Sequence, residues 1–272
     1  KHIVQNITDP DIVPYIPDGI GNSTDRQRIP AVLIIPGGAF RRLVYNFEGE
    51  DVAKWLNSMG IAAFVLECRL PSDEHDNAED VPLIDAMRAM RVIRGRAQEF
   101  GIDEAKIGVM GFSAGGFMAA LLSTAYESDV YVDYKYKDEY DKLSARPDFA
   151  VCSYPVISID DCIEAGKRYM SEEQVLERIS DSKAKILHKY NPDKLVRPDM
   201  PPVFICETDD DRTTLSENSV GFYMAARKAG VSAELHIFRT GGHGYGCGDD
   251  FAQTGEWKVL FTKWIKSIGI IS

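Results

Sequence analysis

The strongest constraint on the fold is an alternation of short apolar runs with longer helical patterns. The runs AVLII (31–35), AAFVLEC (62–68) and KIGVMGF (106–112) have the length and composition of buried strands. Segments with apolar residues at helical spacing lie between them, at 48–59 and 81–100. Strands that are apolar on both faces and separated by helices are typical of a mostly parallel sheet with helices on both faces. The sequence therefore predicts an α/β fold.

The alternation continues to the end of the chain, so we expect a single domain over residues 1–272. Further strands are expected at 3–7, 12–16, 149–155, 202–208 and 233–238, and further helices directly after residue 113, at 215–229 and at 257–268. Two polar excursions, 127–147 and 158–202, interrupt the pattern. We expect them to be solvated loops or a small cap insertion over a site. In such a sheet, sites form beyond the carboxyl ends of the strands.

Composition argues against nucleic-acid and membrane partners. The net charge is −11, without a cluster of Lys and Arg, and the apolar runs are too short to span a bilayer. The five cysteines are scattered and include no C-x-x-C pair, so we expect free thiols and no metal site. Free thiols favour a reducing compartment, and a cytoplasmic location is expected. Because the chain begins at Lys1, a removed leader and a periplasmic or secreted location stay open.

Ser113 lies in GFSAG (111–115), where a strand turns directly into a helix of small residues. This is the G-x-S-x-G pattern, whose glycines leave room for a strained turn that exposes the serine. The same five residues can also be a glycine-rich turn that packs a helix closely on a sheet. A serine hydroxyl becomes a nucleophile only when a base takes its proton, so the pattern predicts a histidine nearby in space.

His243 and a run of aspartates are the candidates for the base and the acid. His243 lies in the glycine-rich loop RTGGHGYGCG, directly after the expected strand AELHIF. Asp209, Asp210 and Asp211 follow another expected strand and stand between the serine and the histidine in chain order. An acid in that place would orient the imidazole and stabilise its charged form. The order Ser, Asp, His is the one found in α/β-hydrolases.

Backbone amides that could stabilise an oxyanion are expected in two places. Ala114 begins the helix after the serine, where the helix dipole favours negative charge. The loop Gly37–Gly38–Ala39 follows the strand AVLII, and its glycines let the backbone approach a substrate closely.

From about Ala31 to the C-terminus, the chain resembles the α/β-hydrolase superfamily. Within it, the chain is similar to the acetyl xylan esterase-like carbohydrate esterases and their dienelactone-hydrolase-like relatives. The resemblance rests on IIPGGAF, EGEDVAKWLNSMGIAAFVLECRLP, PLIDAMRAMRVIRGRAQEFGIDEAKIGVMGFSAGGFMAA and ENSVGFYMAARKAGVSAELHIFRTGGHGYG. It implies the α/β-hydrolase fold.

The resemblance also carries functional roles onto particular residues. It implies that Ser113 is the nucleophile and His243 the histidine of a catalytic triad. It implies that the oxyanion is held by the amides of Gly38, Ala39 and Ala114.

Three departures from the family's pattern affect the site. Ala39 stands where the oxyanion loop usually has a third glycine, and its methyl group would narrow the pocket. The acid loop usually reads Asp-x-x-Val-Pro, whereas this chain has DRTTL; alignment places the acid on Asp211, with Asp210 as the alternative. Cys68 and Phe117 replace the family's Tyr or His landmarks near the substrate.

The resemblance implies a serine carboxylesterase that cleaves short-chain acyl esters, with acetylated xylo-oligosaccharides or other sugars as the substrate class. The expected binding partner of such an enzyme is a small-molecule ester, and the mechanism needs no cofactor or metal. Whether the protein forms a homo-oligomer stays open. The alternatives are a peptidase or thioesterase of the same fold, or a binding protein without catalysis. The presence of both Ser113 and His243 favours an enzyme.

Overall fold

A seven-stranded sheet forms the centre of the computed structural model, which describes residues 2–19, 28–73, 75–132, 138–180, 185–248 and 253–272. The strands lie in the order β2 (Asp11–Tyr15), β5 (Ala62–Glu67), β3 (Ile29–Ile35), β6 (Ile102–Phe112), β7 (Ala150–Ser153), β8 (Val203–Thr208) and β9 (Ala233–Phe238). β2 pairs antiparallel with β5, and the other pairs are parallel. A short antiparallel pair, β1 (Ile3–Val4) and β4 (Leu43–Val44), lies outside this sheet.

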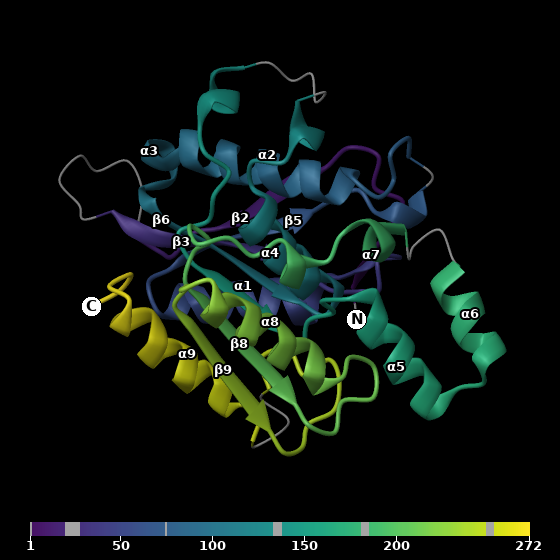
Figure 1. Ribbon diagram of the computed structural model, residues 1–272. Helices are drawn as coiled ribbons and strands as arrows, with labels where there is room; N and C mark the ends of the chain where they lie inside the picture. The colour runs from purple at the N-terminus through teal and green to yellow at the C-terminus, as the bar shows by residue number, and fades with distance from the viewer. Residues whose placement is uncertain (1, 20–27, 74, 133–137, 181–184, 249–252) are drawn as a thin grey trace.

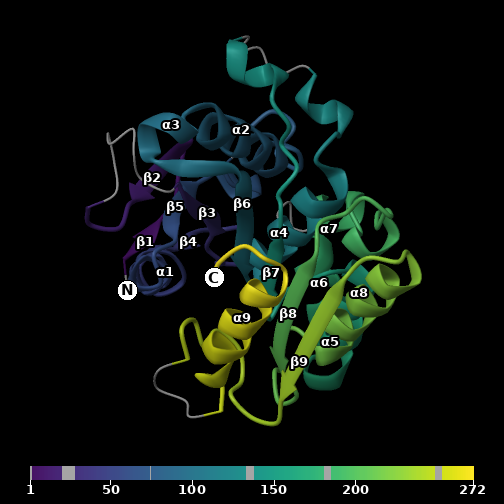
Figure 2. The ribbon, with the colours of Figure 1, turned by 90° about the vertical axis from the view of Figure 1, so that its left-hand side faces the viewer.

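Helices cover both faces of the sheet, because its central strands are apolar on both sides. In β3, Leu33 packs into one core cluster and Ile34 into the other, and both are fully buried. The first cluster is covered by α2 (Val81–Gly95), α4 (Ala114–Ala125) and α8 (Ser216–Lys228), and the second by α1 (Asp51–Ser58) and α9 (Glu256–Ser267). In Figure 2, α9 and α8 flank β8 and β9 from opposite sides. The predicted α/β architecture is confirmed.

Two expected helices differ from the structure. The helix expected at 81–100 is interrupted, because Arg96 leaves the helical conformation with φ −100° and ψ 16°. The additional turn α3 (Ala97–Phe100) then places Phe100 against Phe64 of β5, with ring centroids 4.9 Å apart. The helix expected at 48–59 begins as a π-helical turn, Asn46–Glu50, that continues into α1.

The described part of the 127–147 excursion lies against α2. It contains two 3₁₀ turns, Asp129–Tyr131 and Glu139–Lys142. Arg88 of α2 forms ion pairs with Asp138, which directly precedes the second turn, and with Asp141 within it. Residues 133–137 are outside the described part of the chain.

The 158–202 excursion is mostly helical in its described part. It contains α5 (Ile159–Tyr169), α6 (Glu172–Ser180), α7 (Lys185–Lys189) and the 3₁₀ turn Pro192–Lys194. Figure 1 shows α5 and α6 beside each other at the periphery of the fold. Residues 181–184 are outside the described part. No helix in the described residues combines the length and the apolar character that crossing a membrane requires.

The parallel strands bring the candidate residues to one edge of the sheet. The carboxyl ends of β3, β6, β8 and β9 all lie at the same edge, toward which the arrowheads of β8 and β9 point at the bottom of Figure 1. The loops that follow these strands begin at residues 36, 113, 209 and 239.

Candidate active site

Ser113 occupies a strained turn between β6 and α4. Its φ of 53° and ψ of −117° fall in a region that side-chain-bearing residues rarely adopt. The neighbouring glycines are required by close backbone contacts: a Cβ atom at Gly111 would lie 1.9 Å from the carbonyl oxygen of Gly115. A Cβ atom at Gly115 would lie 1.9 Å from the carbonyl oxygen of Ile35. The turn therefore holds the serine at the carboxyl end of β6, at the edge of the sheet, as the sequence pattern predicts.

The loop after β9 folds through glycines with positive φ. Gly241, Gly242 and Gly244 have φ values of 154°, 61° and 80°. Two hydrogen bonds anchor this loop to the end of β8 and to the loop that follows it. The Thr208 hydroxyl, at the end of β8, donates to the Gly242 carbonyl at 2.9 Å, and the Gly242 amide donates to Asp210 Oδ1 at 2.8 Å. The loop is thereby fixed with its histidine directed toward β6.

Ser113, His243 and Asp211 form a continuous hydrogen-bonded line. The His243 Nε2 atom lies 2.8 Å from Ser113 Oγ, and the Nδ1 atom lies 2.6 Å from Asp211 Oδ2. The Asp211 side chain is fully buried and the histidine side chain is 21% exposed, so the line runs from the protein interior to a solvent-accessible serine. The structure places Asp211, rather than Asp210, against the imidazole.

Asp211 is held as a carboxylate by several donors. Its Oδ1 accepts the amides of Thr213 at 2.7 Å and Thr214 at 3.0 Å, and its Oδ2 accepts the Thr214 hydroxyl at 3.0 Å. Burial acts to raise the pKa of Asp211, but the hydrogen bonds from His243 and from these amides outweigh it and hold the pKa below its usual value. A carboxylate can only accept, so Nδ1 of His243 carries the proton and Nε2 is left to accept from the serine hydroxyl.

The loop after β3 comes beside the serine through a compact turn. Gly38 has φ 142°, and a Cβ atom there would lie 2.0 Å from the Arg42 carbonyl oxygen, so only glycine fits. Ala39 follows in the left-handed region with φ 57° and is exposed. The Gly37 amide donates to Glu48 Oε2 at 2.8 Å and is therefore already engaged. Gly38 and Ala39 are the remaining candidates of this loop for holding an anion.

Ala114 supplies the other candidate amide. It is the first residue of α4, where backbone N–H groups have no partner within the helix and the dipole favours an anion. Ser113 can therefore lose a proton to His243 while negative charge develops near the helix N-terminus.

In the described ranges, no three His, Cys, Asp or Glu side chains come together as a set that could hold a metal ion.

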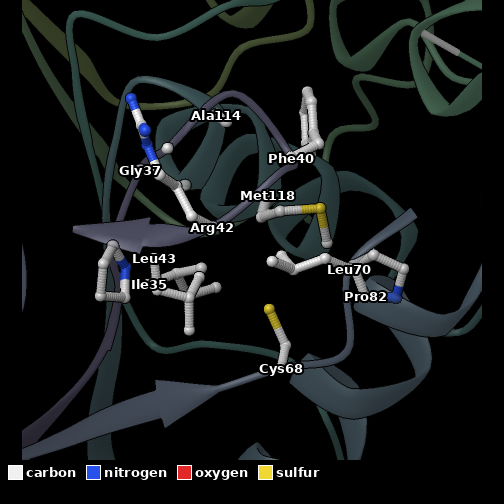
Figure 3. Close-up of a pocket in the computed structure, with 13 residues that line it drawn as sticks. Ile35, Gly37, Phe40, Arg42, Leu43, Cys68, Leu70, Pro82, Ala114 and Met118 are labelled. Carbon is white, nitrogen blue, oxygen red and sulfur yellow. The ribbon is translucent and has the colours of Figure 1, made fainter. Parts of the chain in front are cut away.

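A narrow apolar cavity adjoins these amides (Figure 3). Gly38 and Ala114 are among the residues that line it, and Phe40, Leu70 and Met118 supply apolar walls. Its volume is about 10 Å³, enough for one water-sized group. Two of the family departures lie in this region: Cys68 lines the cavity, and the buried Phe117 ring packs edge-on against Phe40 at 5.6 Å. Ala39, expected to narrow the pocket, is exposed and is not among the residues that line this cavity.

Three buried side chains at the site were missed by the sequence analysis: Tyr154, Glu48 and Glu207. Tyr154 directly follows β7, and its position after the end of a strand could have indicated that it lies near the site. Glu48 lies in the π-helical turn before α1, and nothing local to it indicates a contact with the site. Glu207 is the penultimate residue of an apolar strand, where a carboxylate is unusual.

Glu207 lies next to Asp211 but has the opposite titration behaviour. Its side chain is fully buried, with Oε1 accepting the Thr208 amide at 2.9 Å and Oε2 accepting the Ser219 hydroxyl at 3.3 Å. Burial, and after it the negative charge of Asp211, raises the pKa of Glu207 well above its usual value. The pKa values of the two neighbouring carboxyl groups are therefore shifted in opposite directions, below the usual value for Asp211 and well above it for Glu207.

Comparison with known proteins identifies related chains. The family model described as BD-FAE matches residues 20–225. An acetylxylan esterase from Xylanibacter ruminicola is 31% identical over 240 residues, which are 88% of this chain and 45% of that protein. The chain spans less than half the length of the curated relatives it matches.

Solved structures agree with the fold. The crystal structure of an acetyl ester-xyloside bifunctional hydrolase from Caldicellulosiruptor lactoaceticus is 34% identical, with a TM-score of 0.77 over 100% of this chain and 97% of that one. A carboxylesterase from Lactobacillus plantarum, 21% identical, superposes with a TM-score of 0.79 over 96% of this chain and 94% of that one. These matches confirm the expected α/β-hydrolase-type fold.

The raised pKa of Glu207 predicts a pH-dependent stability effect. In the folded state the group keeps its proton to a higher pH than in the unfolded chain, where it ionises above about pH 4.3. Its contribution to stability is therefore complete below that pH and is lost as pH rises, by at most about 1.4 kcal/mol per pH unit. We expect Glu207→Gln to gain stability relative to the wild type progressively from pH 5 to pH 8, measured by urea unfolding. Parallel stability curves for the two proteins would contradict a raised pKa of Glu207.

Proposed function

The chain belongs to the BD-FAE family, and we propose that it hydrolyses carboxylic esters with small acyl groups through Ser113. The observation that carries this proposal is the line from Ser113 Oγ to His243 Nε2, at 2.8 Å, and from His243 Nδ1 to Asp211 Oδ2, at 2.6 Å. This is the geometry that activates a serine hydroxyl as a nucleophile.

The proposed mechanism uses only groups of this chain and water. His243 accepts the proton of Ser113 as the oxygen attacks the ester carbonyl, and Asp211 stabilises the imidazolium that forms. The amides of Ala114, Gly38 and Ala39 hold the oxyanion of the tetrahedral intermediate. His243 then protonates the leaving alcohol, and water attacks the acyl-enzyme in the same way to release the acid.

Two observations support a small acyl group. The cavity next to Gly38 and Ala114 is apolar and holds about one water-sized group, which suits the methyl of an acetyl ester. The relatives include an acetylxylan esterase and an acetyl ester-xyloside bifunctional hydrolase. We propose acetylated xylo-oligosaccharides as the substrates to test first.

Replacement of the nucleophile tests the reaction class. We expect the wild type to hydrolyse p-nitrophenyl acetate, and Ser113→Ala to lower kcat by on the order of a millionfold because the attacking atom is lost. Ser123→Ala is a matched control: this serine lies on α4, the helix that follows Ser113, but it is buried and its hydroxyl donates to the Ala119 carbonyl within the helix. A Ser113→Ala variant as active as the control would contradict the serine mechanism.

The two candidate acids are distinguished by amide substitution. Asp211→Asn is expected to lower kcat on the order of 10⁴-fold, because an amide in place of the carboxylate favours the wrong imidazole tautomer. Asp210→Asn should have a much smaller effect, because the amide oxygen can still accept from the Gly242 amide. Steady-state kinetics with p-nitrophenyl acetate measures both, and a larger loss in the Asp210 variant would reverse the assignment.

Enlarging the apolar cavity tests the acyl-group proposal. Met118→Ala removes one wall, and we expect the ratio of kcat/KM for p-nitrophenyl butyrate over acetate to rise by about 10-fold or more. Leu122→Ala, one turn further along α4 and equally buried, is the control for a core truncation outside the cavity lining. An unchanged ratio in the Met118 variant would mean that the acyl group binds elsewhere.

A further inference from the structure

Tyr154 is strained at the carboxyl end of β7. Its φ of 36° is unusual for a bulky aromatic residue. The surrounding backbone maintains this conformation, because the Tyr154 amide donates to the Cys206 carbonyl at 2.7 Å. Strain of this kind persists only where the surroundings enforce it. A buried tyrosine that keeps such a conformation beside the candidate active site is expected to have a specific role there.

The Tyr154 hydroxyl connects two loops of the site. It donates to Glu48 Oε1 at 2.9 Å and accepts the Gly246 amide at 3.1 Å. The other oxygen of Glu48 accepts the Gly37 amide at 2.8 Å. The residues Tyr154 and Glu48 are 0% and 4% exposed, so these contacts are shielded from water. We call this pair of side chains the Glu48–Tyr154 bridge.

The Glu48–Tyr154 bridge contacts both of the loops that the proposed mechanism uses. Gly37 immediately precedes the amides of Gly38 and Ala39, and Gly246 lies in the loop that carries His243. The Tyr154 ring also contacts His243 edge-on, with ring centroids 5.1 Å apart. Burial, with a smaller contribution from Glu48, raises the pKa of Tyr154 well above its usual value, so its hydroxyl keeps the proton that it donates.

We infer that the Glu48–Tyr154 bridge positions the oxyanion loop (residues 37–39) relative to the histidine loop (residues 241–248) during ester hydrolysis. Glu48 and Tyr154 are positioning residues, because each acts on the reaction through the amides and the imidazole that it holds in place. The inference rests on the proposed function, in which these two loops act on the same tetrahedral intermediate. A purely structural role would lower stability and leave turnover intact.

Three variants test the bridge by kinetics. Tyr154→Phe removes the hydroxyl, and Glu48→Gln leaves one oxygen where two acceptors are needed, for the Gly37 amide and for the Tyr154 hydroxyl. Each single variant is expected to lower kcat for p-nitrophenyl acetate by about 10- to 100-fold, with a much smaller change in KM. Because both substitutions break the same connection between the two loops, kcat of the double variant should be no lower than kcat of the more impaired single variant.

Tyr126→Phe is the matched control. Tyr126 is also buried, and its hydroxyl donates to the carboxylate of Asp199 at 2.8 Å. It lies at the C-terminal end of α4, whereas Ser113 precedes the N-terminal end. This variant should lose stability and keep wild-type kcat when all proteins are assayed well below their melting temperatures. Wild-type kcat in Tyr154→Phe, or additive losses in the double variant, would overturn the inference.

Amide hydrogen exchange supplies a readout that does not depend on ester hydrolysis. In Glu48→Gln and Tyr154→Phe, exchange should accelerate in segments 36–40 and 243–248, and in Tyr126→Phe it should not. If the wild type cleaved no ester but exchange changed in this way, the proposed function would fail while the connection between the loops stood. If the wild type were active through Ser113 and neither kcat nor exchange changed, the bridge alone would be overturned.

Discussion

Direct contact between backbones at the turn from β6 to α4 is the constraint on which the site depends. Gly111 packs against the carbonyl of Gly115, and Gly115 packs against the carbonyl of Ile35 at the end of β3. The N-terminus of α4 is therefore pressed against the edge of the sheet, where Ser113 takes its strained conformation. The same contact places the amide of Ala114 near the loop that follows β3. Ser113, the N-terminus of α4 and the loop after β3 are thus brought together because Gly111 and Gly115 have no side chains.

The site also shows how surroundings assign different tasks to similar carboxyl groups. Asp211 accepts several hydrogen bonds and remains charged in spite of its burial. Glu207, four residues earlier and fully buried, has its pKa raised well above the usual value by its desolvation and by the charge of Asp211. Glu48 uses both oxygens to join a backbone amide to a tyrosine hydroxyl. Burial, neighbouring charge and the hydrogen-bond donors around each group, rather than residue type, decide what each acid does.

Features that depend on local chemistry could be predicted from the sequence. The alternation of apolar runs predicted the parallel sheet, and glycines around Ser113 and His243 indicated the turns that carry them. Features that depend on contacts between distant segments could not be predicted in the same way. The choice between Asp210 and Asp211 needs the register of the loop after β8, which places one against the Gly242 amide and the other against the imidazole. The hydroxyl of Tyr154 meets Glu48 across 106 positions of sequence, and no periodicity encodes such a contact.

The long sequence separations within the site have a consequence for how the chain folds. Ser113 and His243 are 130 positions apart, and the loop that bears the histidine follows the last strand of the sheet. Contacts of this kind form only after long stretches of chain have been ordered, and topologies rich in them fold slowly. A nascent chain that has emerged only as far as β8 lacks the histidine loop altogether. Appearance of the assembled site during refolding should therefore coincide with completion of the sheet, which makes it a reporter of the last steps of folding.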